Sequence, residues 1–424
     1  MRHTIPINEI GPLAEEMASA VTKCVHCGFC LPACPTYTIM GEEMDSPRGR
    51  IILMKSVLEG KIDLRDAMPY IDRCLGCLGC VTACPSGVSY GDLINPFRAY
   101  INNRRSLSPV KQISRIIERE TIPYPARFKK IAQIGRLGKP IVSLLPEEFQ
   151  AMVDLLPDSL PSPVKLPSIY PAVAKRRARV ALLAGCVQQV LAPEINWATL
   201  RVLSRNGVEV VVPENQTCCG GLAFHTGDRE SVLKFALKNL EAFPSDVDAI
   251  ITNAAGCGSC LHEYPLLFKG TEDFDLAERF AGLVLDVSVF LVKLGISPPP
   301  ELKKPLTVVY QDACHLMHAQ GIMREPRELL SKIPNLTIMP LPEAEFCCGS
   351  AGSYNIEQPA IAQELGNRKV RNILSTNAEG VVTGNIGCLI QIRNHFKKST
   401  DNDQSSPSVW HTVEILDMAY HGVE

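Results

Sequence analysis

The chain has 424 residues, which is enough for two or three domains. Its 46% hydrophobic and 21% charged residues are ordinary for a globular protein and exclude intrinsic disorder as the main description. A formal charge of −2 provides no basic field, so we expect no nucleic-acid partner. The most apolar stretch, 281–296, is interrupted by Asp286 and Lys293, and we expect no membrane-spanning helix.

The cysteines are unusual in number and in distribution. There are 17 of them, with none between Cys84 and Cys186. The first residues, 1–6, show no basic region followed by an apolar core, so we expect a cytoplasmic protein without a secretory signal. Stable disulfides are rare in that compartment, and an odd total argues against a closed disulfide framework. Clustered thiols therefore indicate metal binding or redox chemistry.

The first eight cysteines form two copies of the motif C-x2-C-x2-C-x3-C-P, at 24–35 and 74–85. Bacterial ferredoxins hold two [4Fe–4S] clusters with this spacing, and the fourth cysteine of each run binds the other cluster. The predicted ligands are Cys24, Cys27, Cys30 and Cys84 for one cluster, and Cys74, Cys77, Cys80 and Cys34 for the second. Structural zinc sites are the alternative, but zinc takes four ligands from two pairs rather than from a repeated run of four.

A helix is predicted between the two motifs. Ser46 is a good N-cap, Pro47 suits the first helical position and Gly60 is a good stop signal. Arg48 and Arg50 lie at the start of this helix. Two interpretations of these arginines stay open: they contact a cluster or a partner, or they belong to a solvated helix start.

Residues 106–171 contain ten prolines and no cysteine, which predicts an extended connector. Within it, 110–120 and 127–137 have the pattern of short amphipathic helices.

From about residue 176 the pattern becomes α/β, and it occurs twice. Short apolar runs that predict buried strands each lead to cysteines, and a helix is predicted at 228–243. The predicted strands are 179–184, 208–212 and 249–252 in the first half, and 306–310, 336–339 and 381–383 in the second. Equivalent cysteines are 128, 129 and 131 residues apart (186 to 314, 218 to 347, 257 to 388), which indicates an internal duplication. Cysteines that follow parallel strands should collect at the carboxyl edge of each sheet.

The nine later cysteines resemble those of the "CCG" domains of heterodisulfide reductase. That resemblance implies a third iron–sulfur centre in one of the two halves, which the sequence does not specify. The candidate ligands are Cys186, Cys218, Cys219, Cys257, Cys260, Cys314, Cys347, Cys348 and Cys388. Gln391 departs from the pattern, because it stands where the last cysteine would be. Buried structural thiols are the alternative. His315 and His318 follow Cys314 closely and are candidates for hydrogen bonding, metal binding or proton transfer.

Over almost its full length the chain resembles the iron–sulfur subunit family of glycolate oxidase. The most specific segments are 23–30, 34–37, 46–50, 312–316 and 347–352. The resemblance implies an FAD-containing partner that oxidises a 2-hydroxy acid, glycolate or D-lactate, while this chain passes electrons to the respiratory quinone pool. It also implies peripheral association with the cytoplasmic face of the inner membrane.

The sequence itself has no G-x-G-x-x-G motif after a strand and no Walker-type loop, so FAD is expected on the partner. The isolated chain should therefore lack substrate oxidation. We expect a mixed α+β fold with a helical two-[4Fe–4S] ferredoxin domain (1–105), a proline-rich helical connector (106–175) and two tandem α/β CCG repeats (176–296 and 305–424). The alternative functions are a heterodisulfide or thiol–disulfide reductase, and the iron–sulfur subunit of an anaerobic glycerol-3-phosphate dehydrogenase.

Overall fold

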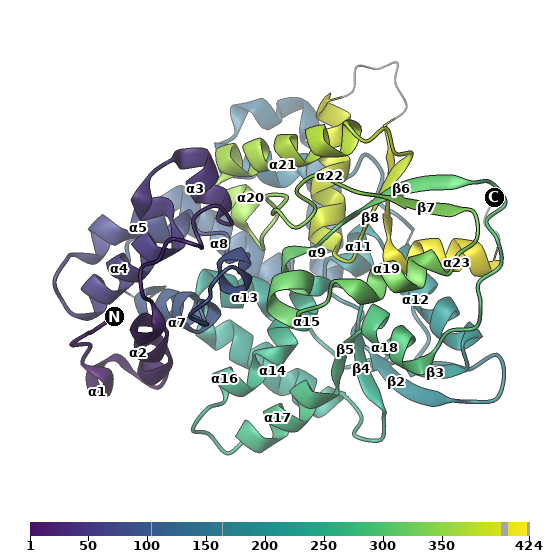
Figure 1. Ribbon diagram of the computed structural model, residues 1–424, viewed down its shortest axis with the longest axis horizontal. Helices are drawn as coiled ribbons and strands as arrows, with labels where there is room; N and C mark the ends of the chain where they lie inside the picture. Colours follow the sequence, from purple (N-terminus) through teal and green to yellow (C-terminus); the bar gives the residue numbers. More distant parts are fainter. Residues whose placement is uncertain (103, 163, 400–405, 422–424) are drawn as a thin grey trace.

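Figure 1 shows the computed structural model, which describes residues 1–102, 104–162, 164–399 and 406–421. Helices form the N-terminal part, drawn in purple, and two mostly parallel sheets lie at the opposite end of the molecule. The predicted mixed α and β fold is therefore confirmed. No helix in the described ranges is both long and apolar enough to cross a membrane.

The N-terminal part surrounds its two cysteine motifs with short helices. These are α1 (Ile7–Ile10), α2 (Ala14–Lys23), α3 (Pro35–Met40), η1 (Glu43–Asp45), α4 (Pro47–Leu58), α5 (Leu64–Asp72), α6 (Gly79–Thr82) and α7 (Gly91–Asn102). Helix α2 packs on α7, and buried side chains such as Met17, Met54 and Phe97 form their common core. Helix α4 begins as predicted, because the Ser46 hydroxyl accepts a hydrogen bond from the Gly49 amide at 3.0 Å.

The connector is more helical than its prolines led us to expect. It contains the two predicted helices, α8 (Pro109–Thr121) and α9 (Pro125–Leu137), and also η2 (Lys139–Leu144) and α10 (Glu147–Asp154). Pro140 lies in the first turn of η2 and Pro146 is the N-cap residue of α10. Proline suits these positions because its missing amide would be unpaired there in any case, so it starts these helices instead of preventing them.

The two halves that follow have the same sheet order. The first sheet is β1 (Ile169–Tyr170), β3 (Val208–Val211), β2 (Ala178–Leu182), β4 (Ala249–Thr252) and β5 (Val284–Asp286), all parallel except β1. The second is β7 (Leu336–Met339), β6 (Leu306–Gln311), β8 (Gly380–Thr383) and β9 (Ser408–His411), all parallel. Apart from β1, the strands correspond one to one, which confirms the predicted duplication.

Helices cover both sheets and join them. Those of the first half are α11 (Gln188–Leu191), α12 (Glu194–Arg205), α13 (Gly221–Thr226), α14 (Arg229–Ala242), α15 (Ala255–His262), α16 (Tyr264–Leu267), α17 (Phe274–Leu283) and α18 (Val287–Leu294). Those of the second are η3 (His315–Ala319), α19 (Arg324–Ser331), α20 (Tyr354–Glu357), α21 (Pro359–Leu374), α22 (Ile386–Ser399) and α23 (Thr412–His421). Helix α12 packs on α23, and Arg201 binds the Asp417 carboxylate with two nitrogens, so the halves share one core.

Candidate metal centres

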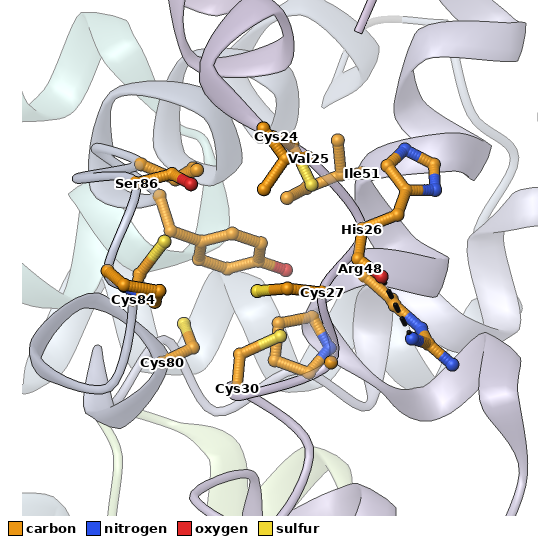
Figure 2. A pocket seen from close by; sticks show the side chains of 15 residues that line it. Cys24, Val25, His26, Cys27, Cys30, Arg48, Ile51, Cys80, Cys84 and Ser86 are labelled. Atoms are coloured by element: carbon orange, nitrogen blue, oxygen red, sulfur yellow. Dashed lines mark hydrogen bonds between the residues drawn. The ribbon is translucent and has the colours of Figure 1, made fainter.

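The first cysteine pocket lies between the two motifs. The sulfurs of Cys24, Cys27, Cys30, Cys80 and Cys84 surround one space (Figure 2). All four predicted ligands of the first cluster are therefore brought together, including Cys84 from the distant motif. Cys27 is exposed, so this pocket lies close to the protein surface.

Local backbone conformation makes the first loop fold around that space. His26 and Gly28 both have positive φ, +59° and +87°, which turns the chain sharply between the cysteines. The Arg48 guanidinium supports the turn, because it donates a hydrogen bond to the His26 carbonyl oxygen at 3.2 Å (Figure 2). Arg48 also pairs with Glu43 at 2.6 Å.

The second pocket adjoins the first and contains the other predicted set. Its lining includes Cys34, Cys74, Cys77 and Cys80, together with Arg50 and Tyr90. Cys80 lines both pockets. Gly76 and Leu78 have positive φ, +66° and +61°, so this loop turns in the same way as the first. The Gly76 amide points at the Cys74 sulfur at 3.4 Å.

Arg50 places a positive charge inside the protein at the second pocket. Its side chain is 1% exposed, and its Nη1 lies 3.8 Å from the Cys34 sulfur. Asp45 accepts a hydrogen bond from Arg50 Nη2 at 3.1 Å and another from Arg73 at 2.9 Å. Of the two interpretations of Arg50, the structure therefore supports contact with the cysteine site.

Burial and nearby charge act in opposite directions on these thiols. Burial raises the pKa of Cys30 to about 11, and burial also raises the pKa of Cys77 and Cys80. Burial opposes ionisation of Cys74 as well, but the charges of Arg50 and Arg98 outweigh it and lower the pKa of that thiol. The thiols at raised pKa stay protonated at neutral pH until a metal takes the place of the proton.

The donor set of both pockets fits iron–sulfur clusters. Among the described lining residues neither pocket contains a carboxylate, and thiols with apolar neighbours are the donors that such clusters prefer. In the described ranges no three His, Cys, Asp or Glu side chains lie close enough to hold a single metal ion. The cysteines instead line a space, as is needed when each thiol binds a different iron atom of one cluster.

In the first repeat, five thiols converge at the carboxyl edge of the sheet. They are Cys186, Cys218, Cys219, Cys257 and Cys260, and the sulfurs of Cys186 and Cys218 are 3.3 Å apart. Gly220 has φ +88°, which allows the two adjacent cysteines to face the same site. Hydrogen bonds from Cys218, Cys257 and Cys260 lower the pKa of Cys219 well below that of a free thiol.

The second repeat has the same arrangement with four thiols, Cys314, Cys347, Cys348 and Cys388. Hydrogen bonds from Cys347 and Cys388 lower the pKa of Cys348, just as the neighbouring thiols of the first repeat lower the pKa of Cys219. Gln391 is buried, and its amide donates to the Ala362 carbonyl oxygen at 3.2 Å. It therefore joins the packing of α21 against α22 at the position where the first repeat has a cysteine.

The second repeat also contacts the second ferredoxin pocket. Cys77 packs with Cys314 and Cys347 in one apolar cluster. His315 is hydrogen-bonded to the Gly76 carbonyl oxygen at 3.0 Å, and His318 to Thr82 at 2.8 Å. Both histidines thus fasten the repeat to the ferredoxin loop, which agrees with the hydrogen-bonding interpretation of these residues.

Two residues near these thiols carried no sequence signal. The ring of His225 lies against that of His315, tilted by 32° and with ring centroids 5.0 Å apart, and burial lowers the pKa of His225 to about 3. Arg98 donates to the carbonyl oxygens of Ile71 and Cys74 at 3.1 and 2.5 Å. Neither lies in a cysteine motif, and only the fold brings them to the loop around Cys74.

Comparisons with known proteins agree with this geometry. Residues 20–88 match the 4Fe–4S dicluster domain, and residues 180–262 and 308–393 each match the cysteine-rich CCG domain. The probable glycolate oxidase iron–sulfur subunit of Bacillus subtilis (strain 168) is 36% identical, over 88% of each chain. The glycolate oxidase iron–sulfur subunit of Escherichia coli (strain K12) is 34% identical, over 96% of each chain.

A shorter relative matches only part of the protein. Lactate utilization protein A 2 of Bacillus cereus (strain Q1) is 30% identical over 56% of this chain and 97% of its own length. The two longer relatives, by contrast, cover both the ferredoxin part and the two repeats. On these matches, the chain belongs to the family of glycolate oxidase iron–sulfur subunits.

Proposed function

We propose that this chain is the iron–sulfur electron-transfer subunit of a flavin-dependent 2-hydroxy-acid dehydrogenase, with glycolate or D-lactate as substrate. The observation that carries the proposal is the row of thiol sites. It begins at the exposed Cys27, continues through the adjoining pocket of Cys74 and Cys77, and reaches Cys314 of the second repeat. Iron–sulfur clusters supply one-electron transfer with little rearrangement when they are bound.

The ligands that we propose follow the pockets. Cys24, Cys27, Cys30 and Cys84 hold one [4Fe–4S] cluster, and Cys34, Cys74, Cys77 and Cys80 hold the other. The nine thiols of the repeats provide room for a third centre, because each repeat gathers at least four of them. The Gly76 amide, Arg50 and Tyr90 surround the second site and set its charge and hydrogen bonding.

The partner and the acceptor complete the proposed complex. FAD is on a separate subunit, which removes two electrons from the hydroxy acid, and this chain holds sites that accept them one at a time. The acceptor is the quinone pool, and the complex is a cytoplasmic assembly that is peripheral to the inner membrane. In this proposal the ferredoxin domain (1–105) holds the two [4Fe–4S] clusters, and the two repeats (176–296 and 305–424) provide the thiols for a third centre.

The test uses the anaerobically purified complex. Adding glycolate or D-lactate should bleach the visible absorbance of the clusters when the flavoprotein is present. The isolated chain with a dye acceptor should not oxidise the acid. Turnover of the acid by the isolated chain, or unchanged absorbance in the complex, would contradict the proposal. Iron and acid-labile sulfide of about eight per chain would mean two cubanes, and about twelve a third centre.

One observation favours a second function, thiol–disulfide reduction. The lowered pKa of Cys219 and Cys348 makes them nucleophilic thiolates, as in disulfide reductases. Their exposure of 5% and 1% speaks against it, because a disulfide substrate cannot reach them without opening the fold. Disulfide reduction by the chemically reduced chain, abolished by Cys348→Ser, would favour this function.

A further inference from the structure

The connector exposes an unusual amount of aliphatic side chain on one continuous segment. We call this the α9–η2 surface and define it by Ile131, Ile134, Leu137, Ile141, Leu144 and Leu145. Leu137 and Leu144 are 84% and 83% exposed, and Ile134 and Ile141 are 64% and 61% exposed. Single exposed apolar residues are normal, but a run of six within fifteen residues marks an interaction surface.

Helix α9 is held with this surface outward. Its opposite side is buried, where Phe128 and Ala132 pack against Val190 and Leu191 of the first repeat. Gly135 lies on the same inner side, and a Cβ there would be only 2.9 Å from Leu156. The helix therefore has two apolar sides, and packing within the chain uses only one of them.

The charge of the same segment is one-sided. Between Thr121 and Pro146 the sequence has no aspartate or glutamate. It has five basic residues, Arg127, Lys129, Lys130, Arg136 and Lys139. Carboxylates come from the flanking segments: Glu120 pairs with Arg127, and Asp158 pairs with Lys139 and Lys397. Glu147 and Glu148 begin α10, just after Leu145. The α9–η2 surface is thus an aliphatic stripe whose cationic border lies along α9, with Lys129, Lys130 and Arg136, while its far end meets two glutamates.

We infer that the α9–η2 surface docks this protein on an anionic lipid bilayer. An aliphatic face bordered by lysine and arginine is what interfacial helices present to lipid, where the apolar side chains enter the acyl boundary and the cations meet the headgroups. A protein partner is favoured less, because binding hot spots are rich in tryptophan and tyrosine, which the stripe lacks, and interface cores are poor in lysine. The inference deepens the proposed function, on which it rests, by naming the surface that brings the chain to a membrane-dissolved acceptor.

The experiment measures sedimentation of the full cluster-loaded chain with lipid vesicles. One set is made of phosphatidylglycerol and phosphatidylethanolamine in equal parts, and the other of phosphatidylcholine alone. We expect binding to the anionic vesicles only, weakened by salt because the cations contribute. The double variant Ile134→Ser/Leu137→Ser should lower the bound-to-free ratio about tenfold, and Lys129→Gln/Lys130→Gln should lower it less. The matched control is Val173→Ser, which changes a 68% exposed residue outside the surface and should bind as the parent does.

The outcomes separate this inference from the proposed function. Vesicle binding that is absent in the parent, or equal in the parent and Ile134→Ser/Leu137→Ser, overturns the docking surface even if the hydroxy acid still bleaches the complex. Release of the flavoprotein by the same variant, without a change in vesicle binding, identifies a protein interface and also overturns it. Loss of bleaching with intact vesicle binding contradicts only the proposed function. Iron content and the thermal midpoint of each variant verify that it is folded.

Discussion

Replacing Arg50 by glutamine should lower the reduction potential of the centre in the second pocket. The guanidinium stabilises the reduced form, because that form carries one more negative charge. Its Nη1 is 3.8 Å from the Cys34 sulfur, where two unit charges interact by about 4 kcal/mol at an effective dielectric constant of about 20. The added electron spreads over the whole cluster, so much of its charge lies farther from Arg50 than the Cys34 sulfur does, and solvent around the cluster screens it further. About 1–2 kcal/mol remains, which equals about 40–80 mV for one electron.

An anaerobic redox titration followed by EPR measures this shift. Only the more buried centre should move, because Cys34 and not Cys24 lies beside Arg50. Arg50→Lys keeps the charge and should restore most of the potential. Arg48→Gln is the matched control, since Arg48 is 29% exposed and solvent screens its charge. An unchanged potential in Arg50→Gln, or equal shifts in Arg50→Gln and Arg50→Lys, would refute the electrostatic reasoning.

Three further predictions address the repeats and the connector. Gly349→Ala should destabilise the protein by about 2–4 kcal/mol, because φ is +88° and the new Cβ would lie 2.6 Å from a carbonyl oxygen of α21. Thermal unfolding measures this loss of stability. The control is Gly282→Ala, which has open space around the new Cβ and should be neutral or slightly stabilising. A third centre held by the second repeat needs Cys348, so Cys348→Ser should then remove about four irons per chain while the EPR signals of the ferredoxin centres persist. Unchanged iron would mean that the second repeat's cysteines are structural. Burial raises the pKa of Glu118 to about 7, so the folded state holds its proton more tightly than the unfolded chain and stability falls as pH rises from about 4 to 7. Glu118→Gln should therefore raise the thermal midpoint at pH 8 more than at pH 5, and an equal change at both pH values would show that this carboxyl does not control the pH dependence.

Local patterns were sufficient for much of the fold. The strands at 249–252 and 336–339 were predicted with the bounds that the structure has, because each is a short apolar run with β-branched residues between turn-forming residues, Asp248 and Asn253 for the first and Asn335 and Pro340 for the second. Strands β1, β5 and β9 were not predicted. β1 has two residues, β5 is the end of an apolar run that also reads as helix, and β9 follows a polar segment. Each is defined by its neighbour in the sheet, which a local pattern does not contain.

For the candidate sites as well, local sequence predicted some contacts and could not predict others. Cysteine spacing was enough to propose which thiols share a ferredoxin pocket, because three ligands of each set are close in sequence and the fourth follows from the ferredoxin pattern. The contact of Cys77 with Cys314, and that of the His225 ring with the His315 ring, join residues that are far apart in the chain. No periodicity or spacing encodes such contacts, since they depend on how the finished domains pack.

The attachment of the Cys74 loop to the second repeat has a consequence for biosynthesis. Arg73 and Gly76 are hydrogen-bonded to Tyr354 and His315, so the loop reaches its final surroundings only after most of the chain has left the ribosome. Until then its thiols face water and dissolved oxygen, which oxidises exposed thiolates. Iron and sulfide delivered before translation ends would meet an open loop, whereas delivery afterwards would have to pass a closed one. Maturation of this protein is therefore a matter of timing as well as of ligand supply.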